Sequence, residues 1–373
     1  MMTLLSACGA QSDPGGASAG ASGSGSGNVA DLAECTTRVF DFSILDATYS
    51  AGLERLVLLT PVDIVVLDPI TLDETHIGFG SNDTGELYGS IALAPDGKSA
   101  AVSRDRAVSI VDLGAGALKA TIPSVDSAGD VVMGGNGYAY VLPYRGLNDR
   151  DDYALHSFDI ANATEHGDDS TGFVAADTSI ELQPGGASIY AIEHVTPGHL
   201  ERFDISKGDP VGPIENLEEQ RGPEHAQCGD LWFNSDGTRV FNSCGTVFKA
   251  APGAKDDMAY LSSLAPIPNS KPSDAPFRYF SVDDAHDRIY AIPGAQILND
   301  AEQAYRTERT LAWYGYASQE LLGTKEVPCM AIHGQKMMVA ARFVFHTADG
   351  TRVMVLADQY PIGQSGLAVF DAE

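Results

Sequence analysis

The chain has 373 residues, of which 44% are hydrophobic, and its 51 acidic and 23 basic residues give a net charge of −28. A field of that sign repels nucleic acid and anionic lipid headgroups, so we exclude nucleic acid as a partner and expect membrane contact only through an anchor. No apolar run approaches the roughly 20 residues of a spanning helix. The acidic surface is either simply solvated or attractive to cations and basic partners.

The N-terminal segment LSACG, residues 5–9, resembles the lipobox of bacterial lipoproteins, which implies Cys8 as the lipidated residue. Only seven residues precede Cys8, so a complete export signal would begin upstream. The Gly/Ser run that follows is too poor in apolar groups to fold. We expect a bacterial cell-envelope protein, either an outer-membrane lipoprotein or extracellular, organised as partial signal and lipobox 1–8, flexible tether 9–30 and folded domain 31–373.

Beyond the tether, a short apolar strand that ends in aspartate recurs along the chain. The intervals between the first four of these aspartates are 44, 47 and 45 residues. Two degenerate copies, near Ala250 and Gly315, precede the last one and bring the number of repeats to seven. The aspartates are Asp68, Asp112, Asp159, Asp204 and Asp371.

Each copy is preceded by two strands joined by a turn, usually with glycine, and KATIPS after Asp112 illustrates a fourth strand. Alternating Val, Ile, Tyr and Phe with Asp-Gly turns predicts β structure throughout. Four strands every 45 residues or so are typical of a β-propeller blade. We therefore predict an all-β fold, a propeller of seven four-stranded blades, with six or eight left open because the last two repeats are longer.

The segment IALAPDGKSAAVSRDRAVSIVDLGAGALKATI carries a resemblance to propellers with YVTN-type repeats, the YncE-like group, which are often exported in bacteria. The resemblance covers residues 36–373 and implies the fold, whereas this fold hosts unrelated activities. The chain lacks a Gly-His…Trp-Asp signature, so a WD40 assignment is not supported.

The two ends of the folded region are complementary. Gly366–Asp371 reads as a third strand with nothing after it, and Thr36–Phe42 precedes the first hairpin. Pairing of these N- and C-terminal strands would close the ring and remove exposed edges.

The stretch CGDLWFNSDGTRVFNSC places Cys228 and Cys244 symmetrically about a turn. A three-residue hairpin loop that pairs Asn234 with Thr238 would set the cysteines opposite each other, within reach of a disulfide. The alternative is a pair of buried free thiols, as in cytosolic proteins. An oxidising compartment favours the disulfide, and it leaves Cys35 and Cys329 as a second pair whose connectivity the sequence does not fix.

In a four-stranded blade, the loops between the second and third strands share a face with the loops that link blades, and we expect a ligand site there. The candidate ligand-binding residues are Arg104, Tyr144, Arg145, Glu193, His194, Arg221, Glu224, His225 and Arg278. Glu193-His194 and Glu224-His225, from adjacent blades, suit Zn²⁺ or another divalent ion, or a general acid/base dyad. The alternative for all four is ordinary loop residues bonded to neighbouring backbone. Acidic loops such as 149–152 raise Ca²⁺ as a cofactor but lack EF-hand spacing.

No HExxH, G-x-S-x-G, P-loop or dinucleotide motif occurs outside the Gly/Ser run, which matches such patterns trivially. We therefore favour a non-enzymatic role as a monomeric scaffold for an unknown protein or a small-molecule or saccharide ligand, with the insertion 296–309 as a partner contact. The alternative is a metal-dependent hydrolase or lyase acting on a lactone, ester or saccharide. A quinoprotein ranks third, because the repeats lack its tryptophan docking pattern.

Overall fold

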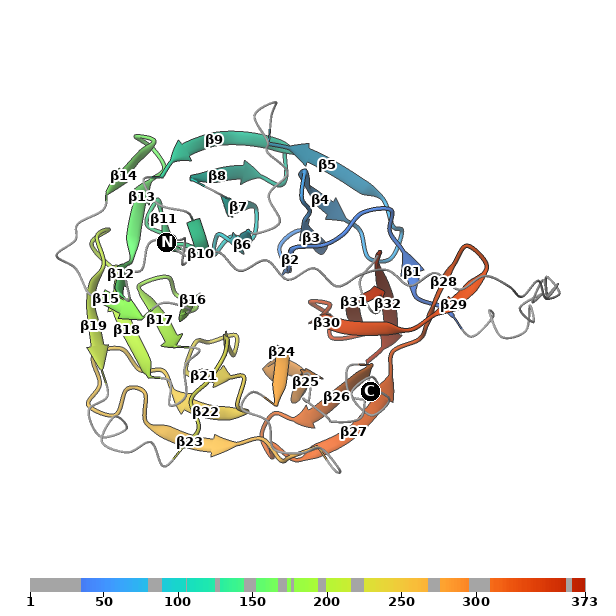
Figure 1. Ribbon diagram of the computed structural model, residues 1–373. Coiled ribbons are helices and arrows are strands. Elements are labelled where there is room, and N and C mark those ends of the chain that lie inside the picture. The colour runs from blue at the N-terminus through green and yellow to red at the C-terminus, as the bar shows by residue number, and fades with distance from the viewer. Residues whose placement is uncertain are drawn as a thin grey trace, which may run out of the picture.

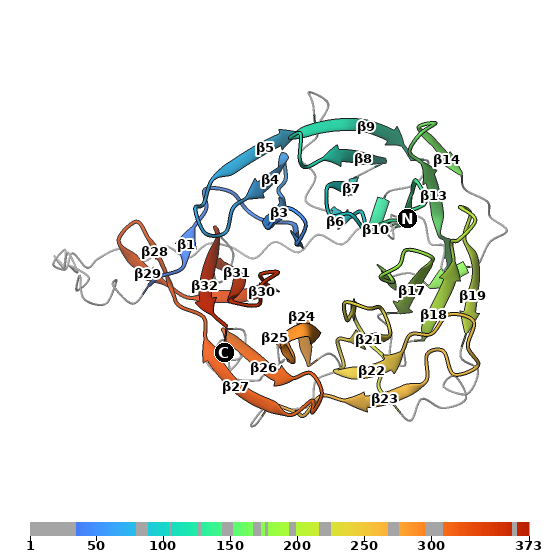
Figure 2. The same ribbon diagram turned by 180° about the vertical axis from the view of Figure 1, so that it is seen from behind.

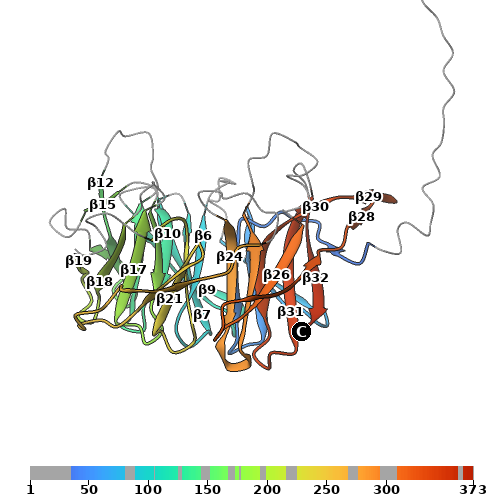
Figure 3. The ribbon, with the colours of Figure 1, turned by 90° about the horizontal axis from the view of Figure 1, so that it is seen from below.

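The computed structural model describes residues 35–79, 89–104, 106–124, 128–143, 152–166, 173–175, 178–193, 199–215, 225–267, 276–294, 309–359 and 364–372. Seven four-stranded antiparallel sheets surround a central axis, which confirms the predicted all-β, seven-bladed propeller (Figures 1 and 2). In the side view the blades stand next to one another as a flat disc (Figure 3).

Each blade runs from an inner strand at the axis to an outer strand at the rim (Figure 1). The inner strands are β2 (Asp46–Ser50), β6 (Ser90–Leu93), β10 (Ala128–Met133), β16 (Thr178–Leu182), β20 (Leu231–Phe233), β24 (Phe277–Asp283) and β30 (Val339–His346). The second strands are β3 (Arg55–Leu59), β7 (Ser99–Arg104), β11 (Tyr138–Pro143), β17 (Ser188–Glu193), β21 (Arg239–Asn242), β25 (Arg288–Pro293) and β31 (Arg352–Gln359).

The third strands are β4 (Asp63–Leu67), β8 (Ala107–Asp112), β13 (His156–Asp159), β18 (Leu200–Asp204), β22 (Thr246–Lys249), β26 (Thr310–Gly315) and β32 (Ser365–Asp371). The outer strands are β5 (Glu74–Gly78), β9 (Ala117–Pro123), β14 (Thr164–His166), β19 (Val211–Glu215), β23 (Tyr260–Ser263), β27 (Leu321–Glu326) and β1 (Arg38–Val39). Two small pairs lie outside the blades: β12 (Asp152–Ala154) with β15 (Phe173–Ala175), and β28 (Met330–Ile332) with β29 (Gln335–Met337).

Helix is almost absent. Within the described ranges the one helix is the three-residue η1 (Asp284–His286), and none is long and apolar enough to cross a membrane.

The N-terminal strand closes the ring, as predicted. β1 pairs with β32, with Arg38 opposite Leu367 and Val39 opposite Gly366. A disulfide between Cys35 and Cys329, whose Cα atoms are 4.4 Å apart, fastens the start of β1 to the link that enters the last blade. The predicted second cysteine pair is therefore confirmed, and the last blade is built from both ends of the folded chain.

Packing between blades supplies the hydrophobic core. Buried apolar side chains form seven clusters, one at each junction between neighbouring blades. Side chains alternate across a strand, so one face of the inner strand β2 buries Ala47 while the other turns Asp46 and Thr48 toward the axis. This alternation decides which residues of the inner strands face the central channel.

The repeated aspartates after the third strands hold the following turns. Asp112 Oδ1 accepts the backbone N–H of Ala115 at 2.9 Å, and Asp204 Oδ1 accepts that of Ser206 at 2.9 Å. The Ala115 N–H bond and then the Lys119 ammonium lower the pKa of Asp112 below its usual value. Hydrogen bonding to the backbone of the turn is enough to explain why aspartate recurs after the third strands.

The hairpin around Asp236-Gly237 differs from the prediction by one residue. Asn234 pairs with Arg239, and not with Thr238, so the loop holds four residues instead of three. The reason is the Asn234 side chain, whose Oδ1 accepts the Arg239 N–H at 2.8 Å and so closes the wider loop. Gly237 occupies the left-handed region with φ 69°, as its place in the turn predicts.

The predicted Cys228–Cys244 disulfide forms despite that shift, with a Cα–Cα distance of 5.6 Å. The N–H of Ser243 donates to both Cys228 O and Asp230 O at 3.1 Å, so the chain bulges at Gly229, whose φ is 68°. The bulge compensates for the wider loop. Two disulfides in one chain point to a compartment outside the cytoplasm.

Candidate functional site

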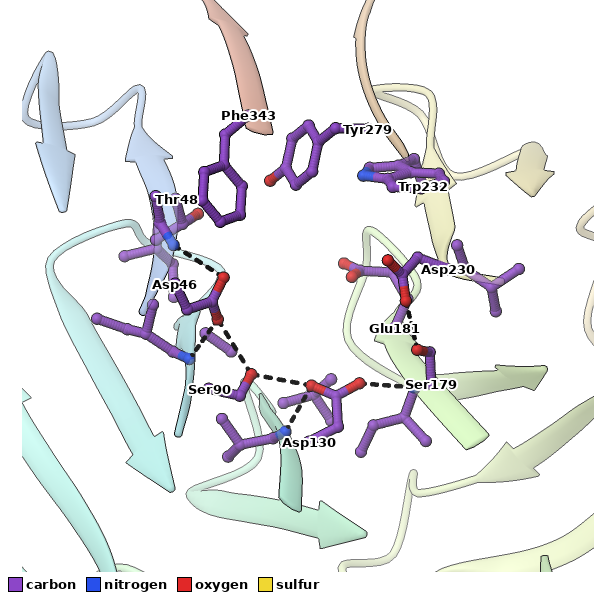
Figure 4. Close-up of a pocket in the computed structure, with 18 of the residues that line it drawn as sticks. Asp46, Thr48, Ser90, Asp130, Ser179, Glu181, Asp230, Trp232, Tyr279 and Phe343 are labelled. Atoms are coloured by element: carbon purple, nitrogen blue, oxygen red, sulfur yellow. Dashed lines mark hydrogen bonds between the residues drawn. The ribbon is translucent and has the colours of Figure 1, made fainter. Parts of the chain in front are cut away.

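A cavity of about 660 Å³ lies on the axis, at the end of the channel where the inner strands begin. All seven blades contribute to its wall, and Figure 4 shows the side chains that face it. Its polar and aromatic lining residues are Asp46, Thr48, Ser90, Asp130, Ser179, Glu181, Asp230, Trp232, Arg278, Tyr279, Arg342 and Phe343.

Four carboxylates line one part of this wall, and we call them the carboxylate arc: Asp46, Asp130, Glu181 and Asp230 (Figure 4). They come from the first, third, fourth and fifth blades. Asp46 is the first residue of β2 and Asp230 directly precedes β20, whereas Asp130 and Glu181 lie within β10 and β16.

The first two carboxylates bind the neighbouring inner strand. Asp46 Oδ2 accepts the Ile91 N–H at 2.8 Å, and Asp130 Oδ2 accepts the Ile180 N–H at 2.8 Å. Ser90 Oγ lies between them, 3.2 Å from Asp46 Oδ2 and 2.9 Å from Asp130 Oδ1. These carboxylates therefore hold blades together as well as lining the cavity.

The other two carboxylates differ from each other. Asp230 accepts the hydroxyl of Ser179 at 2.5 Å. Glu181, two residues along β16 from Ser179, points into the cavity and has no hydrogen-bond partner among the described residues. Its side chain is half-buried and forms part of the cavity wall.

Burial and crowding of like charge raise the pKa values in the arc. For Glu181, burial and then the charges of Asp130, Asp230 and Asp46 raise the pKa to about 8. For Asp130, burial is the larger cause and the charges of Asp230 and Asp46 add to it, so that the pKa rises to about 7 against the lowering effect of the Ile180 N–H bond. Burial also raises the pKa of Asp46, although its hydrogen bonds and Arg342 oppose the shift. At neutral pH the arc is thus only partly charged.

Three rings from the fifth, sixth and seventh blades complete the wall, and we call them the aromatic arc: Trp232, Tyr279 and Phe343 (Figure 4). Tyr279 packs edge to face between the other two, with ring centroids 5.5 Å from Trp232 and 5.2 Å from Phe343. Burial raises the pKa of Tyr279 well above its usual value, so its hydroxyl stays protonated.

Two arginines also reach the cavity, and both donate to backbone carbonyls. Arg342 donates to the carbonyls of Ile44 and Leu45 at 2.7 and 2.8 Å and pairs with Asp358 at 3.0 Å, so it joins the last blade to the first. Arg278, one of the residues predicted from sequence, donates to the Ala341 carbonyl at 3.2 Å and lines the same cavity.

Three other predicted site residues lie elsewhere in the described structure. Arg104 is buried, donates to the Pro61 carbonyl at 2.7 Å and lies over the ring of Phe79, between the first two blades. His225 stacks on Tyr260 with 3.4 Å between ring centroids. Glu193 ends β17. Their role as ligand-binding residues stays a prediction.

The remaining predicted residues fall outside the described ranges: Tyr144, Arg145, His194, Arg221, Glu224 and most of the insertion 296–309. The proposed metal set of Glu193, His194, Glu224 and His225 therefore has two described members and stays a prediction. Among the described residues, no three His, Cys, Asp or Glu side chains converge on a metal position.

Sequence reasoning missed the carboxylate and aromatic arcs because it looked for ligands in loops. A signal was present, since Asp or Ser opens the inner segments DATY, SIAL, DVVM, SIEL and DLWF. Superposing the repeats on this position would have placed Asp46, Ser90, Asp130, Ser179 and Asp230 in one ring.

No family model and no curated protein matches the chain. Among solved structures, hydrazine synthase of Kuenenia stuttgartiensis is similar, with 14% identity, a TM-score of 0.58 and coverage of 90% of this chain and 97% of that one. The Cps50 (Swd1) β-propeller domain of Myceliophteria thermophila is similar as well, with 12% identity, a TM-score of 0.59 and coverage of 89% and 98%. At such identities the likeness shows the propeller fold alone.

Proposed function

We propose that the protein is an exported, lipid-anchored β-propeller of the bacterial cell envelope that binds a ligand in its axial cavity. The observation that carries the binding role is the cavity itself, because its volume of about 660 Å³ lies in the range of small-molecule sites. Convergent polar and aromatic side chains from all seven blades line it. A ring closed by β1 and by a disulfide supports such a preformed site.

The proposed location in the cell envelope rests on separate observations. Two disulfides fit an oxidising compartment, and LSACG followed by a Gly/Ser tether fits a lipoprotein anchored through Cys8. Expressed with a bacterial lipoprotein signal, the full chain should incorporate an alkyne-tagged fatty acid and sediment with membranes. Cys8→Ser should release it to the soluble fraction without label. Label that persists in Cys8→Ser would overturn the anchor.

Blocking the cavity tests the binding role. Thr48 lines the cavity on β2, so Thr48→Trp should place an indole ring in the cavity and obstruct ligand binding. Ile70 is 60% exposed in a turn of the first blade, and Ile70→Trp is the matched control. After incubation with a metabolite extract, wild type and Ile70→Trp should retain the same small molecules by mass spectrometry, and Thr48→Trp should retain none of them. Equal retention by all three proteins would reject the cavity as the binding site.

A further inference from the structure

The two arcs of the cavity have complementary preferences for one kind of ligand. The carboxylate arc supplies negative charge, and the aromatic arc supplies ring surfaces on the facing side (Figure 4). A cation attached to apolar groups gains from both, because ring faces attract cations and apolar area is removed from water. An anion would face the carboxylates, and a neutral apolar molecule would add no charge to balance theirs.

Glu181 is the second, independent indication of a cation. The other three carboxylates accept hydrogen bonds from backbone or serine groups, whereas the half-buried Glu181 side chain points into the cavity and its carboxylate has no hydrogen-bond partner among the described residues. A carboxylate held next to three others without a partner of opposite charge is costly for the free protein. An incoming cation would supply the partner that the chain does not.

In the described structure neither of the two arginines that line the cavity is hydrogen-bonded to Glu181. Arg342 is engaged by two carbonyls and Asp358, and Arg278 donates to the Ala341 carbonyl. The chain as a whole, with a charge of −28, attracts cations toward its surface. The charged or titratable groups around Glu181 are thus Asp46, Asp130, Asp230, Tyr279 and these two arginines.

We propose that the cavity binds a small organic cation, an alkylammonium head whose apolar part packs on the aromatic arc while the head faces Glu181. The inference rests on the proposed function only in taking the same cavity as the binding site. The source we favour is a free small molecule, since the cavity has the volume of a small-molecule site. A lysine side chain of a peptide offers the same chemistry, and the test separates the two.

Isothermal titration of the full chain uses four probes: butyltrimethylammonium, butylammonium, the neutral butanol, and N-acetyl-lysine N-methylamide for the peptide source. We expect the two free cations to bind, butanol not to bind, and the lysine probe to bind more weakly than either. Glu181→Gln should lower the affinity for butyltrimethylammonium by about fivefold or more, and Trp232→Leu should lower it by about fivefold. Asp96 lies on an exposed turn and accepts the Lys98 N–H, a bond that the amide oxygen of Asn can keep. The control variant Asp96→Asn should therefore bind the probes as wild type does.

The pH dependence gives a readout that a purely structural role would not produce. Butyltrimethylammonium keeps its charge at every pH, so only protein groups titrate. Binding requires ionised carboxylates, so its affinity should rise between pH 6 and 8.5, by at most about tenfold per pH unit for each proton released, and then level off. Glu181→Gln should flatten the upper part of that rise.

Several results would overturn the inference: equal binding of butanol, no binding of either free cation at millimolar concentration, unchanged affinity in Glu181→Gln, or displacement of the probes by stoichiometric Ca²⁺ or Zn²⁺. Tighter binding of the lysine probe would overturn the free-molecule source. If the cations fail while Thr48→Trp still abolishes retention of metabolites, the proposed function stands and this inference falls. If wild type retains no metabolite, the proposed function itself fails.

Discussion

At the residue scale, Glu181 stands half-buried beside three other carboxylates. Its pKa is about 8 in the folded chain against an ordinary value of 4.5, so folding favours the protonated form. Such a group contributes stability at low pH and loses it as pH rises through the folded pKa, here between about 4.5 and 8. Relative to wild type, Glu181→Gln should therefore melt at a similar temperature near pH 4.5 and about 2 °C or more higher above pH 8.

Thermal denaturation over a pH series checks this expectation. Asp96→Asn, at an exposed turn, should track the wild-type profile throughout. A melting difference for Glu181→Gln that stays constant with pH would contradict a raised pKa for Glu181.

The ion pair of Arg202 and Asp257 is buried between the fourth and fifth blades. The Nε–Oδ2 distance is 2.8 Å, both side chains are 7% exposed, and the Tyr190 hydroxyl donates to Asp257 at 2.7 Å. Arg202→Ala would remove the guanidinium that balances the buried Asp257 charge, so it should lower the free energy of unfolding by about 3–5 kcal/mol in urea denaturation. Arg352→Ala removes a pair on the exposed surface and should stay near wild type. Equal losses in the two variants would refute the distinction.

At the element scale, the inner strands are joined across blades by side chain to backbone bonds. Asp130 accepts the Ile180 N–H of the next inner strand. No hydrogen bond of the β16–β17 ladder would take its place if Asp130 were removed. In Asp130→Ala the Ile180 amide should exchange its hydrogen faster, whereas Asp130→Asn keeps an acceptor and should preserve protection. Hydrogen exchange read by NMR or mass spectrometry distinguishes the variants. Equal protection in both would show that the bond does not hold the strand.

The elements themselves were predictable because each repeat carries its own turn chemistry. Asp-Gly turns and strand-ending aspartates mark hairpins locally, and the repeat recurs seven times. Details set by single side chains were not predictable. The Asn234 side chain widened its loop by one residue, and the Gly229 bulge then restored the approach of Cys228 and Cys244.

The cavity lining was less accessible to sequence reasoning than the fold. Which side chains face the axis is decided only when the ring assembles. In the sequence, Glu181 and Trp232 are each simply one residue of a half-buried strand. Of the residues proposed from loops, Arg278 lines the cavity, while Arg104 is buried between blades. Loop position alone did not distinguish these two arginines.

At the scale of the whole molecule, the ring depends on its closure. The Cys35–Cys329 disulfide spans 294 residues and the Cys228–Cys244 disulfide spans 16. The entropy that a disulfide removes from the unfolded chain grows with loop length. Loss of the Cys35–Cys329 disulfide should therefore lower the free energy of unfolding more than loss of the Cys228–Cys244 disulfide, within a range of about 2–5 kcal/mol. Denaturation of Cys35→Ser/Cys329→Ser and Cys228→Ser/Cys244→Ser variants gives the comparison. The reverse order would argue against ring closure as the larger contribution.

Binding of an organic cation against the aromatic arc is the central claim, and the two tryptophans allow a direct test. Trp232 lines the cavity, whereas Trp313 lies on β26 against Gly323, away from the axis. In 5-fluorotryptophan-labelled protein, ¹⁹F NMR during titration with butyltrimethylammonium should show one resonance that shifts saturably, assigned to Trp232 by substitution, and one that stays in place. A Trp232 resonance that does not move, or two resonances that move together, would contradict the account.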